Sequence, residues 1–171
     1  MLKINILNAC PGDESQIITL LRETWLATYP NKEHNITKED ILKKDWDSKD
    51  RLEKWKKVIA ENGKNNIFNF VAKENDKFIG FCQIVRGVEN NELKIIYVLP
   101  DYQRKGIGRM LLDKARLMLD PAKDTIVEVV AYNNGAINFY QKIGFVKFES
   151  GNGHEFSHGK MVPTIRMKLK R

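Results

Sequence analysis

Residues 95–119 read Ile-Ile-Tyr-Val-Leu-Pro-Asp-Tyr-Gln-Arg-Lys-Gly-Ile-Gly-Arg-Met-Leu-Leu-Asp-Lys-Ala-Arg-Leu-Met-Leu. The first five residues predict a buried strand, which Pro100 ends because proline has no amide hydrogen for a strand ladder. After a short loop, apolar residues recur at the three-and-four spacing of one helix face, with no helix breaker before Pro121. These apolar residues are Ile107, Met110, Leu111, Ala115 and Met118. The stretch therefore predicts a strand, a glycine loop and a helix in succession.

The loop between that strand and that helix has the features of an anion site. Its glycines, Gly106 and Gly108, permit positive φ and let a ligand come close to the backbone. Free amides at the start of a helix, together with the helix dipole, stabilise a phosphate without a dedicated side chain. Arg104, Lys105 and Arg109 add positive charge. The loop therefore predicts a phosphate site, and a turn that carries glycine for geometry alone is the alternative.

Two common phosphate-binding patterns do not fit this loop. A Walker loop requires Lys and then Ser or Thr after its second glycine, and no such pair follows Gly108. The dinucleotide fingerprint requires a third small residue where this chain has Leu111. What remains is Gln-x-x-Gly-x-Gly directly after a strand that ends in Val-x-Pro. This pattern resembles the acetyl-CoA pyrophosphate loop of the GNAT superfamily of N-acetyltransferases.

A second stretch strengthens the resemblance. Residues 133–145, Asn-Asn-Gly-Ala-Ile-Asn-Phe-Tyr-Gln-Lys-Ile-Gly-Phe, are similar to the second GNAT signature and follow the first in the family's order. The resemblance covers residues 70–148 strongly and extends more weakly to residues 23–29. Asn133 and Tyr140 lie two helical turns apart and therefore on one helix face.

The order of predicted elements fits an α/β (α+β) chain. Strands are expected at 1–7, 67–73, 78–85, 95–99, 125–131, 145–149 and 164–169, and helices at 13–29, at 37–61 in two pieces broken near 47–48, from 107, and from 133. Such alternation predicts a mixed sheet with helices on both faces. The resemblance implies that the sheet has about seven strands, mostly antiparallel, and that a bulge around residues 97–99 splays it. At 171 residues we expect a single domain over 1–171.

Composition limits the partners of the chain. A net charge of +7 favours anionic partners, and coenzyme A with its phosphates is one. No helix-turn-helix or RNP-like aromatic motif is visible, which disfavours nucleic acid. No apolar run reaches the roughly 20 residues of a membrane span, and the start lacks the features of a signal peptide, so we expect a cytoplasmic protein without a membrane partner. Cys10 and Cys82 are too far apart in sequence to indicate a disulfide framework or a thiolate metal site, and we interpret both as packing residues.

Several aromatic and histidine residues allow two readings. Trp25, Trp46 and Trp55 have a helical spacing typical of core packing, although they could stack on a substrate. His154 and His158 lie in a glycine-broken loop at 151–159 without an obvious third ligand, so we predict no metal site. Both histidines could instead line an acceptor pocket.

The resemblance assigns the cofactor-binding residues, with acetyl-CoA as the cosubstrate. They are Ile96, Tyr97, Val98, Gln103, Arg104, Lys105, Gly106, Ile107, Gly108, Arg109, Asn133 and Tyr140. Asn133 is expected to contact the pantetheine arm through its side-chain amide. Tyr140 is expected to protonate the departing thiolate, because a phenol with a pKa near 10 keeps its proton at neutral pH. The alternative for Tyr140 is a core aromatic beside Phe139.

Two glutamates are candidates for the base that deprotonates the amine. An alkyl ammonium with a pKa near 10.4 is almost entirely protonated at pH 7, so a base is needed. Glu128, the first candidate, lies among apolar residues of a predicted strand and falls twelve residues before Tyr140. The resemblance places the catalytic glutamate of ribosomal-protein alanine acetyltransferases at that same offset, and an outward-facing strand position is the alternative. Glu92, at the start of the central strand, is the second candidate.

The reaction implied is direct attack of a primary amine on acetyl-CoA in a ternary complex, since no nucleophile constellation is visible. The acceptor stays open between a small amine, an amino acid derivative and a peptide N-terminus. A polyamine acetyltransferase and a ribosomal-protein or peptide N-terminal acetyltransferase are the alternatives, and a non-catalytic acyl-CoA sensor is the alternative class. The oligomeric state stays open, with a homodimer as one option.

Overall fold

The computed structural model describes residues 3–157 and 159–170. Seven strands form one sheet in the order β1-β2-β3-β4-β5-β9-β6. They are β1 (Ile4–Asn8), β2 (Ile67–Glu74), β3 (Lys77–Arg86), β4 (Asn91–Val98), β5 (Thr125–Val130), β6 (Val146–Ser150) and β9 (Thr164–Leu169). Every neighbouring pair is antiparallel except β4 and β5, which are parallel. The predicted mixed, mostly antiparallel sheet is therefore confirmed.

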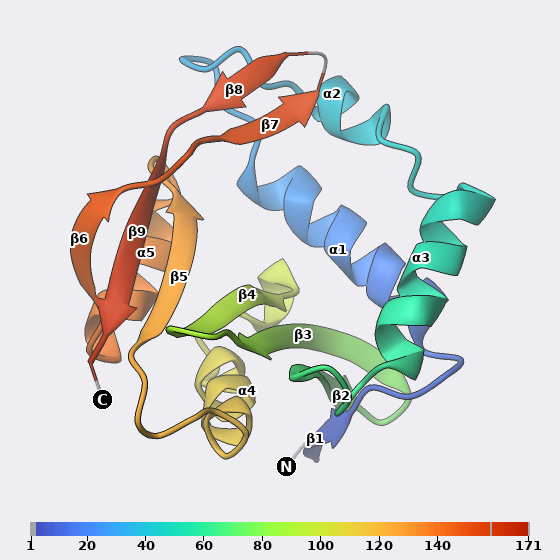
Figure 1. The fold of residues 1–171 in the computed structure, drawn as a ribbon. Coiled ribbons are helices and arrows are strands. Elements are labelled where there is room, and N and C mark those ends of the chain that lie inside the picture. The colour runs from blue at the N-terminus through green and yellow to red at the C-terminus, as the bar shows by residue number, and fades with distance from the viewer. Residues whose placement is uncertain (1–2, 158, 171) are drawn as a thin grey trace.

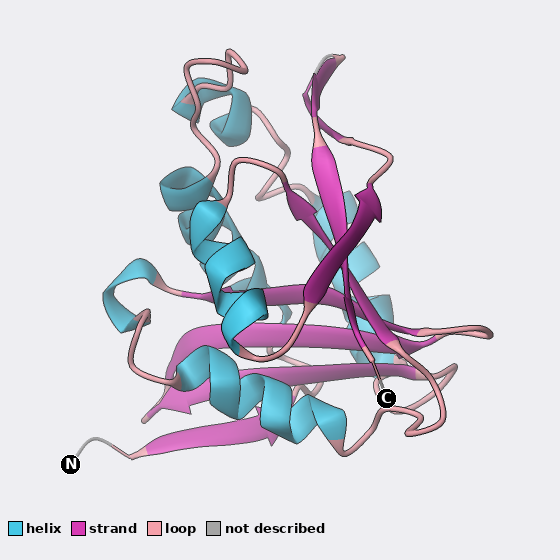
Figure 2. Ribbon diagram, turned by 90° about the vertical axis from the view of Figure 1, so that its left-hand side faces the viewer, coloured by secondary structure: helices cyan, strands magenta, loops and turns pink. Residues whose placement is uncertain are grey.

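The sheet divides where β4 meets β5. These strands pair only over Asn91–Leu93 and Thr125–Val127, and beyond that point they diverge (Figure 1). In Figure 2 the first four strands run across the molecule, whereas the other three rise away from them. The splayed sheet is thus present.

The bulge that accompanies this divergence lies elsewhere than expected. Leu93 faces Ile84 and Ile95 faces Gln83, so the inserted residue of β4 is Lys94. The prediction of a bulge around residues 97–99 was wrong, because those residues keep a regular antiparallel register with β3. An extra residue in one strand bends it and increases its twist. The bulge thus lies one residue beyond Leu93, the last β4 residue that pairs with β5.

Helices cover both faces of the first four strands. Neighbouring residues of β3 point to opposite faces: a side chain at Gly80 would meet Leu111 of α4 (Ile107–Arg116), whereas Phe81 contacts Trp55 of α3 (Lys49–Ala60). Helix α1 (Glu14–Thr28) also packs on β3 and β4. The remaining helices are α2 (Lys38–Leu42), the 3-10 turn η1 (Pro100–Tyr102) and α5 (Asn134–Lys142), which lies behind β5 and β9 in Figure 1.

Capping explains where the helical segments begin. Thr37 forms a capping box with Asp40 at the start of α2, and the Ser48 hydroxyl accepts from the Arg51 amide at the start of α3. The expected break near residues 47–48 is therefore confirmed. Helix α4 is shorter than its apolar pattern suggested, and Met110 is 40% exposed, so its assignment to the buried face was wrong.

One hairpin was missed by the sequence analysis. The segment read as a loop at 151–159 contains β7 (His154–Ser157), which pairs with β8 (Lys160–Val162) beside α2 (Figure 1). Lys160 fastens the hairpin, because its ammonium donates to the Asp40 carboxylate at 2.7 Å and to the Asn35 carbonyl at 2.9 Å. Of the cysteines, Cys82 is buried as expected, whereas Cys10 is exposed.

Candidate active site

A cleft of about 1510 Å³ runs through the gap between β4 and β5. Its lining combines α1 and α3 with the free edges of the two strands, the loop before α4, and α5. The bulge at Lys94 and the early end of pairing create this opening. The cleft therefore joins the two predicted motifs to helices that come much earlier in the chain.

The loop before α4 presents a row of unused main-chain donors. Within the described residues, the amides of residues 104–109 donate no hydrogen bond, because the first helical bond runs from Met110 to the Gly106 carbonyl. Arg104 (φ 59°) and Gly106 (φ 82°) adopt the left-handed conformation that turns the chain into the helix. The Gln103 side chain donates to the Val98 carbonyl at 3.1 Å and ties the loop to β4. Such a row of amides at a helix start is a binding site for phosphate.

Most of the predicted cofactor residues line the cleft. They are Ile96, Tyr97, Val98, Gln103, Arg104, Gly106, Gly108, Arg109, Asn133 and Tyr140. Two others are not part of the lining: Ile107 is 1% exposed in the core, and the Lys105 ammonium lies 5.1 Å from the ring centroid of Tyr102, which does line the cleft. The contribution expected from these two residues is therefore a hydrogen bond from the main-chain amide.

The start of α4 and the side of α5 form one wall of the cleft. A side chain at Gly108 would lie 3.3 Å from the Phe139 ring, so the glycine permits this close helix contact. Asn133 caps α5, since its Oδ1 accepts from the Ala136 amide at 3.1 Å. That bond uses the side-chain oxygen and leaves the Nδ2 donor for the cleft.

Tyr140 reaches the cleft from a buried position. Its side chain is only 5% exposed, and its ring packs against those of Phe139 and Phe145 at centroid distances of 5.4 and 5.5 Å. The hydroxyl makes no hydrogen bond to the described residues, and Tyr140 is one of the residues that line the cleft. Burial raises the pKa of Tyr140 far above its ordinary value, and the nearby Tyr29 and Cys82 raise it further. The phenol therefore keeps its proton throughout the neutral range.

An aromatic cluster that the sequence analysis did not identify lies beside Tyr140. The hydroxyls of Tyr29 and Tyr97 are hydrogen-bonded to each other, and burial raises the pKa of Tyr97 to about 12. Tyr29 also contacts Trp25 and Phe156, at centroid distances of 5.1 and 4.8 Å. The residues come from α1, β4 and β7, so no local pattern could have grouped them.

The expected core packing of the three tryptophans is confirmed, and stacking on a substrate stays a prediction. Trp46 is buried, and Trp25 and Trp55 pack on the core, yet all three contribute to the lining of the cleft. Trp46 is fixed by a hydrogen bond from its ring nitrogen to the Ile41 carbonyl at 2.7 Å.

Glu128 is the only one of the two candidate bases that lines the cleft within the described part of the chain. It is the exposed residue of an otherwise buried strand β5. Its Oε1 accepts hydrogen bonds from the Asn152 amide, at 3.1 Å, and from the Thr164 hydroxyl. Glu92 lies instead where β4 still pairs with β5, and its carboxylate forms an ion pair with Lys94. The geometry favours Glu128.

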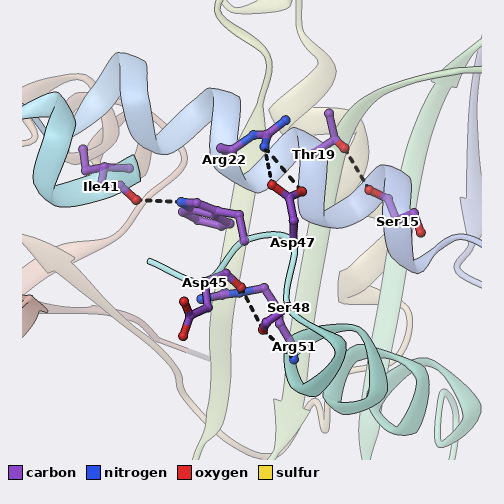
Figure 3. Close-up of polar contacts among 9 residues, drawn as sticks. Ser15, Thr19, Arg22, Ile41, Asp45, Asp47, Ser48 and Arg51 are labelled. Carbon is purple, nitrogen blue, oxygen red and sulfur yellow. Dashed lines mark hydrogen bonds and ion pairs between the residues drawn. The ribbon is translucent and has the colours of Figure 1, made fainter. Parts of the chain in front are cut away.

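The segment between α2 and α3 forms the outer wall of the cleft. Figure 3 shows how this segment is held: Arg22 of α1 pairs with Asp47 at 3.2 Å, and the Ser48 hydroxyl donates to the Asp45 carbonyl at 3.0 Å. Arg51 donates to the same carbonyl at 2.8 Å. Its guanidinium stacks over Trp46, 4.6 Å from the ring centroid. A rigid, partly basic wall results.

The charged lining is mixed rather than acidic. The acids are Asp45, Asp50 and Glu128, and the bases are Arg51, Lys54, Lys94, Arg104, Arg109 and Lys142. His154 also lines the cleft, and burial lowers its pKa, with Lys44 acting in the same direction. His158, the other histidine considered, lies outside the described residues. Residues 3–157 and 159–170 contain no group of His, Cys, Asp and Glu suited to a metal ion. None of their helices is long and apolar enough to cross a bilayer.

Comparison with known proteins gives a family match over the middle of the chain and relatives of known activity. Residues 65–147 match the model of the acetyltransferase (GNAT) domain. The chain is 29% identical to the spermidine N(1)-acetyltransferase of Thermoplasma acidophilum over 159 residues, which cover 91% of this chain and 95% of that one. It is 34% identical to the ribosomal protein bS18-alanine N-acetyltransferase of Escherichia coli over 94 residues.

The second match is partial. It covers 52% of this chain and 62% of the Escherichia coli enzyme, and other curated relatives are matched over 41% and 50% of their length. Among solved structures, the PaiA N-acetyltransferase of Thermoplasma acidophilum in complex with coenzyme A superimposes with a TM-score of 0.77, at 24% identity and with 99% of both chains covered. That likeness extends the agreement in fold to the whole chain.

The family match, the full-length relative and the shared fold agree with the two motifs and with the cleft that they line. Residues 65–147 therefore match the acetyltransferase (GNAT) domain family, and the chain as a whole shares the fold of the coenzyme A-bound PaiA N-acetyltransferase.

Proposed function

We propose that this chain transfers the acetyl group of acetyl-CoA to a primary amine by direct attack in a ternary complex, and that the cleft through the β4–β5 gap holds both substrates. The observation that carries the proposal is the continuity of this cleft. It extends from six unused amides at residues 104–109 to the Glu128 carboxylate. An anionic coenzyme suits the first end, and a protonated amine suits the second.

The roles of the individual residues follow from their surroundings. The amides of residues 104–109, with Arg104 and Arg109, bind the diphosphate of the coenzyme. Glu128 accepts a proton from the acceptor ammonium, either directly or through water. The amine nitrogen then attacks the thioester carbonyl, the new C–N bond forms and the C–S bond breaks. The Tyr140 hydroxyl gives its proton to the departing sulfur as the attacking nitrogen loses its second proton, which restores the phenol, so that coenzyme A leaves as the thiol.

The acceptor we propose is a small molecule or peptide that carries one primary amine. The lining of the cleft has three carboxylates against six cations, among them Arg51 and Lys54 on α3. A polycation would find no excess of acid there, and the nearby cations would repel its second amine. A polyamine is the second candidate, because the relative matched over nearly the full length is a spermidine acetyltransferase. A homodimer stays a prediction.

Thiol release from acetyl-CoA, measured with a panel of amines, tests this proposal. The panel contains spermidine, a peptide that starts with alanine, and small monoamines of matched pKa. We expect release with at least one acceptor and a higher kcat/KM for a monoamine or the peptide than for spermidine. Binding of acetyl-CoA without release in any reaction would indicate a non-catalytic sensor, and a preference for spermidine would reverse the acceptor assignment.

Substitution of Gly106 tests the anion site. Gly106→Ala places a side chain at φ +82°, which costs about 1–2 kcal/mol in the left-handed region and displaces the loop amides. Gly63→Ala is a matched control, because Gly63 has a φ of +80°, with open space around it, in a loop outside the cleft lining. Calorimetry should show a Kd for acetyl-CoA raised roughly tenfold in Gly106→Ala only, which corresponds to about 1.4 kcal/mol. Equal affinities in the two variants would remove the loop from the binding site.

Removal of the Tyr140 hydroxyl tests its role as donor. Tyr140→Phe should lower kcat roughly a hundredfold and leave the Kd for acetyl-CoA unchanged, since the ring still fills its place. Tyr132→Phe is the control, because Tyr132 is not among the residues that line the cleft and its hydroxyl donates only to the main-chain carbonyl of Tyr29, and this variant should retain most of the rate. Because the pKa of Tyr140 is raised, the parent rate should not fall on the alkaline side below about pH 10. A hundredfold loss of acetyl-CoA affinity instead of kcat would assign Tyr140 to binding.

Paired substitution of the two glutamates tests the identity of the base. Glu128→Gln should lower kcat about a hundredfold or more, and the loss should be larger for an alkylamine with a pKa near 10.4 than for an α-amine near 8. Glu92→Gln should cause the smaller loss, because Glu92 is not among the residues that line the cleft and its carboxylate is already paired with Lys94. The reverse order of the two variants would assign the base to Glu92.

A further inference from the structure

We propose that Thr164 is a positioning residue for Glu128. Its hydroxyl and the Asn152 amide hold Oε1 of the carboxylate, so that Oε2 is the oxygen that accepts the proton of the acceptor amine. This inference rests on the base role proposed above for Glu128. It assigns a task to a residue that neither sequence motif contains.

The hydrogen-bond directions around Thr164 are fixed. The Gly153 amide donates to Thr164 Oγ1 at 2.9 Å, which makes this oxygen an acceptor on that side. The hydroxyl hydrogen is therefore available for the Glu128 carboxylate, to which Oγ1 is hydrogen-bonded. Thr164 is 6% exposed, and both side chains contribute to the cleft lining. A buried hydroxyl with both partners in place has little freedom to turn.

The two oxygens of Glu128 differ as a result. Oε1 accepts from both the Asn152 amide and the Thr164 hydroxyl, whereas Oε2 accepts no hydrogen bond from the described residues. Each carboxylate oxygen has two lone-pair sites, so Oε1 is occupied and Oε2 has free acceptor capacity. Because the two hydrogen bonds hold Oε1 in place, the free oxygen Oε2 of the same carboxylate is held in a single orientation.

A competing cation is kept away from this carboxylate. Arg166 lies directly opposite Glu128 in the β5–β9 register and would be its natural ion-pair partner. Its guanidinium instead binds Glu149 of β6 and stacks on Phe148, 5.4 Å from the ring centroid. Among the described residues Glu128 has no ion pair. A carboxylate paired with arginine would be a weaker proton acceptor.

The space for this arrangement depends on Gly151. A Cβ at Gly151 would overlap Thr164 Oγ1 and Glu128 Oε1. The φ angle of Gly151 lies outside the left-handed range, so its backbone does not require glycine. Glycine at position 151 therefore leaves the space in which the Thr164 hydroxyl contacts the Glu128 carboxylate.

Four variants test the proposal. Thr164→Val removes the hydroxyl with little change of shape, Thr164→Ser keeps it, and Gly151→Ala displaces the carboxylate without deleting any functional group. Thr125→Val is the matched control, since Thr125 is a buried threonine of the same sheet outside the cleft lining. We expect kcat to fall roughly ten- to a hundredfold in Thr164→Val and Gly151→Ala, with KM for acetyl-CoA near that of the parent. Thr164→Ser and Thr125→Val should keep most of the parent kcat.

Crystal structures of Thr164→Val and Gly151→Ala provide a readout that does not depend on knowing the acceptor. The Glu128 carboxylate should leave its place beside residue 164 in both variants and keep it in Thr164→Ser. A carboxylate that stays in place, or a parent-like kcat in both variants while Glu128→Gln is impaired, would overturn the positioning role. Parent-like turnover of Glu128→Gln itself would instead refute the base role on which the inference rests.

Discussion

Strands β4 and β5 pair over only three residues each, and the rest of the molecule is arranged around the gap that follows. Main-chain donors and acceptors inside a protein need partners, so a parallel pair that stops early leaves an edge for water or a ligand to complete. The bulge at Lys94 turns β4 away directly after Leu93, where pairing with β5 ends. An extended, amide-containing chain such as the pantetheine arm of coenzyme A can supply the missing partners.

The two ends of this gap have opposite character. One end has the free amides of residues 104–109 with Arg104 and Arg109, and the other has the Glu128 carboxylate beside aromatic rings from α1 and β7. Tyr140 of α5 lies near Tyr29, at the end of α1, and near Cys82 of β3. These residues are distant from Tyr140 in the sequence. The cleft therefore has a cationic, amide-rich end and an end with a carboxylate, and the proposed function assigns the first to the coenzyme and the second to the amine.

Sequence reasoning worked where the signal is local. The glycine loop at 103–108, the helix that begins at Asn133 and the alternation of elements depend on neighbouring residues, and all three are confirmed. It failed where tertiary structure decides. The position of a one-residue bulge depends on how two strands twist, and β7 and β8 are too short for alternation to be visible.

Contacts between distant residues were equally invisible. Thr164 and Glu128 lie 36 residues apart and meet only because β5 and β9 pair. The sequence ranked Glu128 ahead of Glu92, but only the structure shows that Glu128 lines the cleft whereas Glu92 lies where β4 still pairs with β5. The single domain over residues 1–171 stays a prediction.

The most direct test of this account is amide hydrogen exchange in the presence and absence of acetyl-CoA. The amides of residues 94–98 on the open edge of β4 and those of residues 104–109 should exchange more slowly once the coenzyme is bound, while β6 and β9, on the far side of β5, should change little. Binding of acetyl-CoA that leaves the exchange of both segments unchanged would contradict the claim that the β4–β5 gap is the coenzyme site.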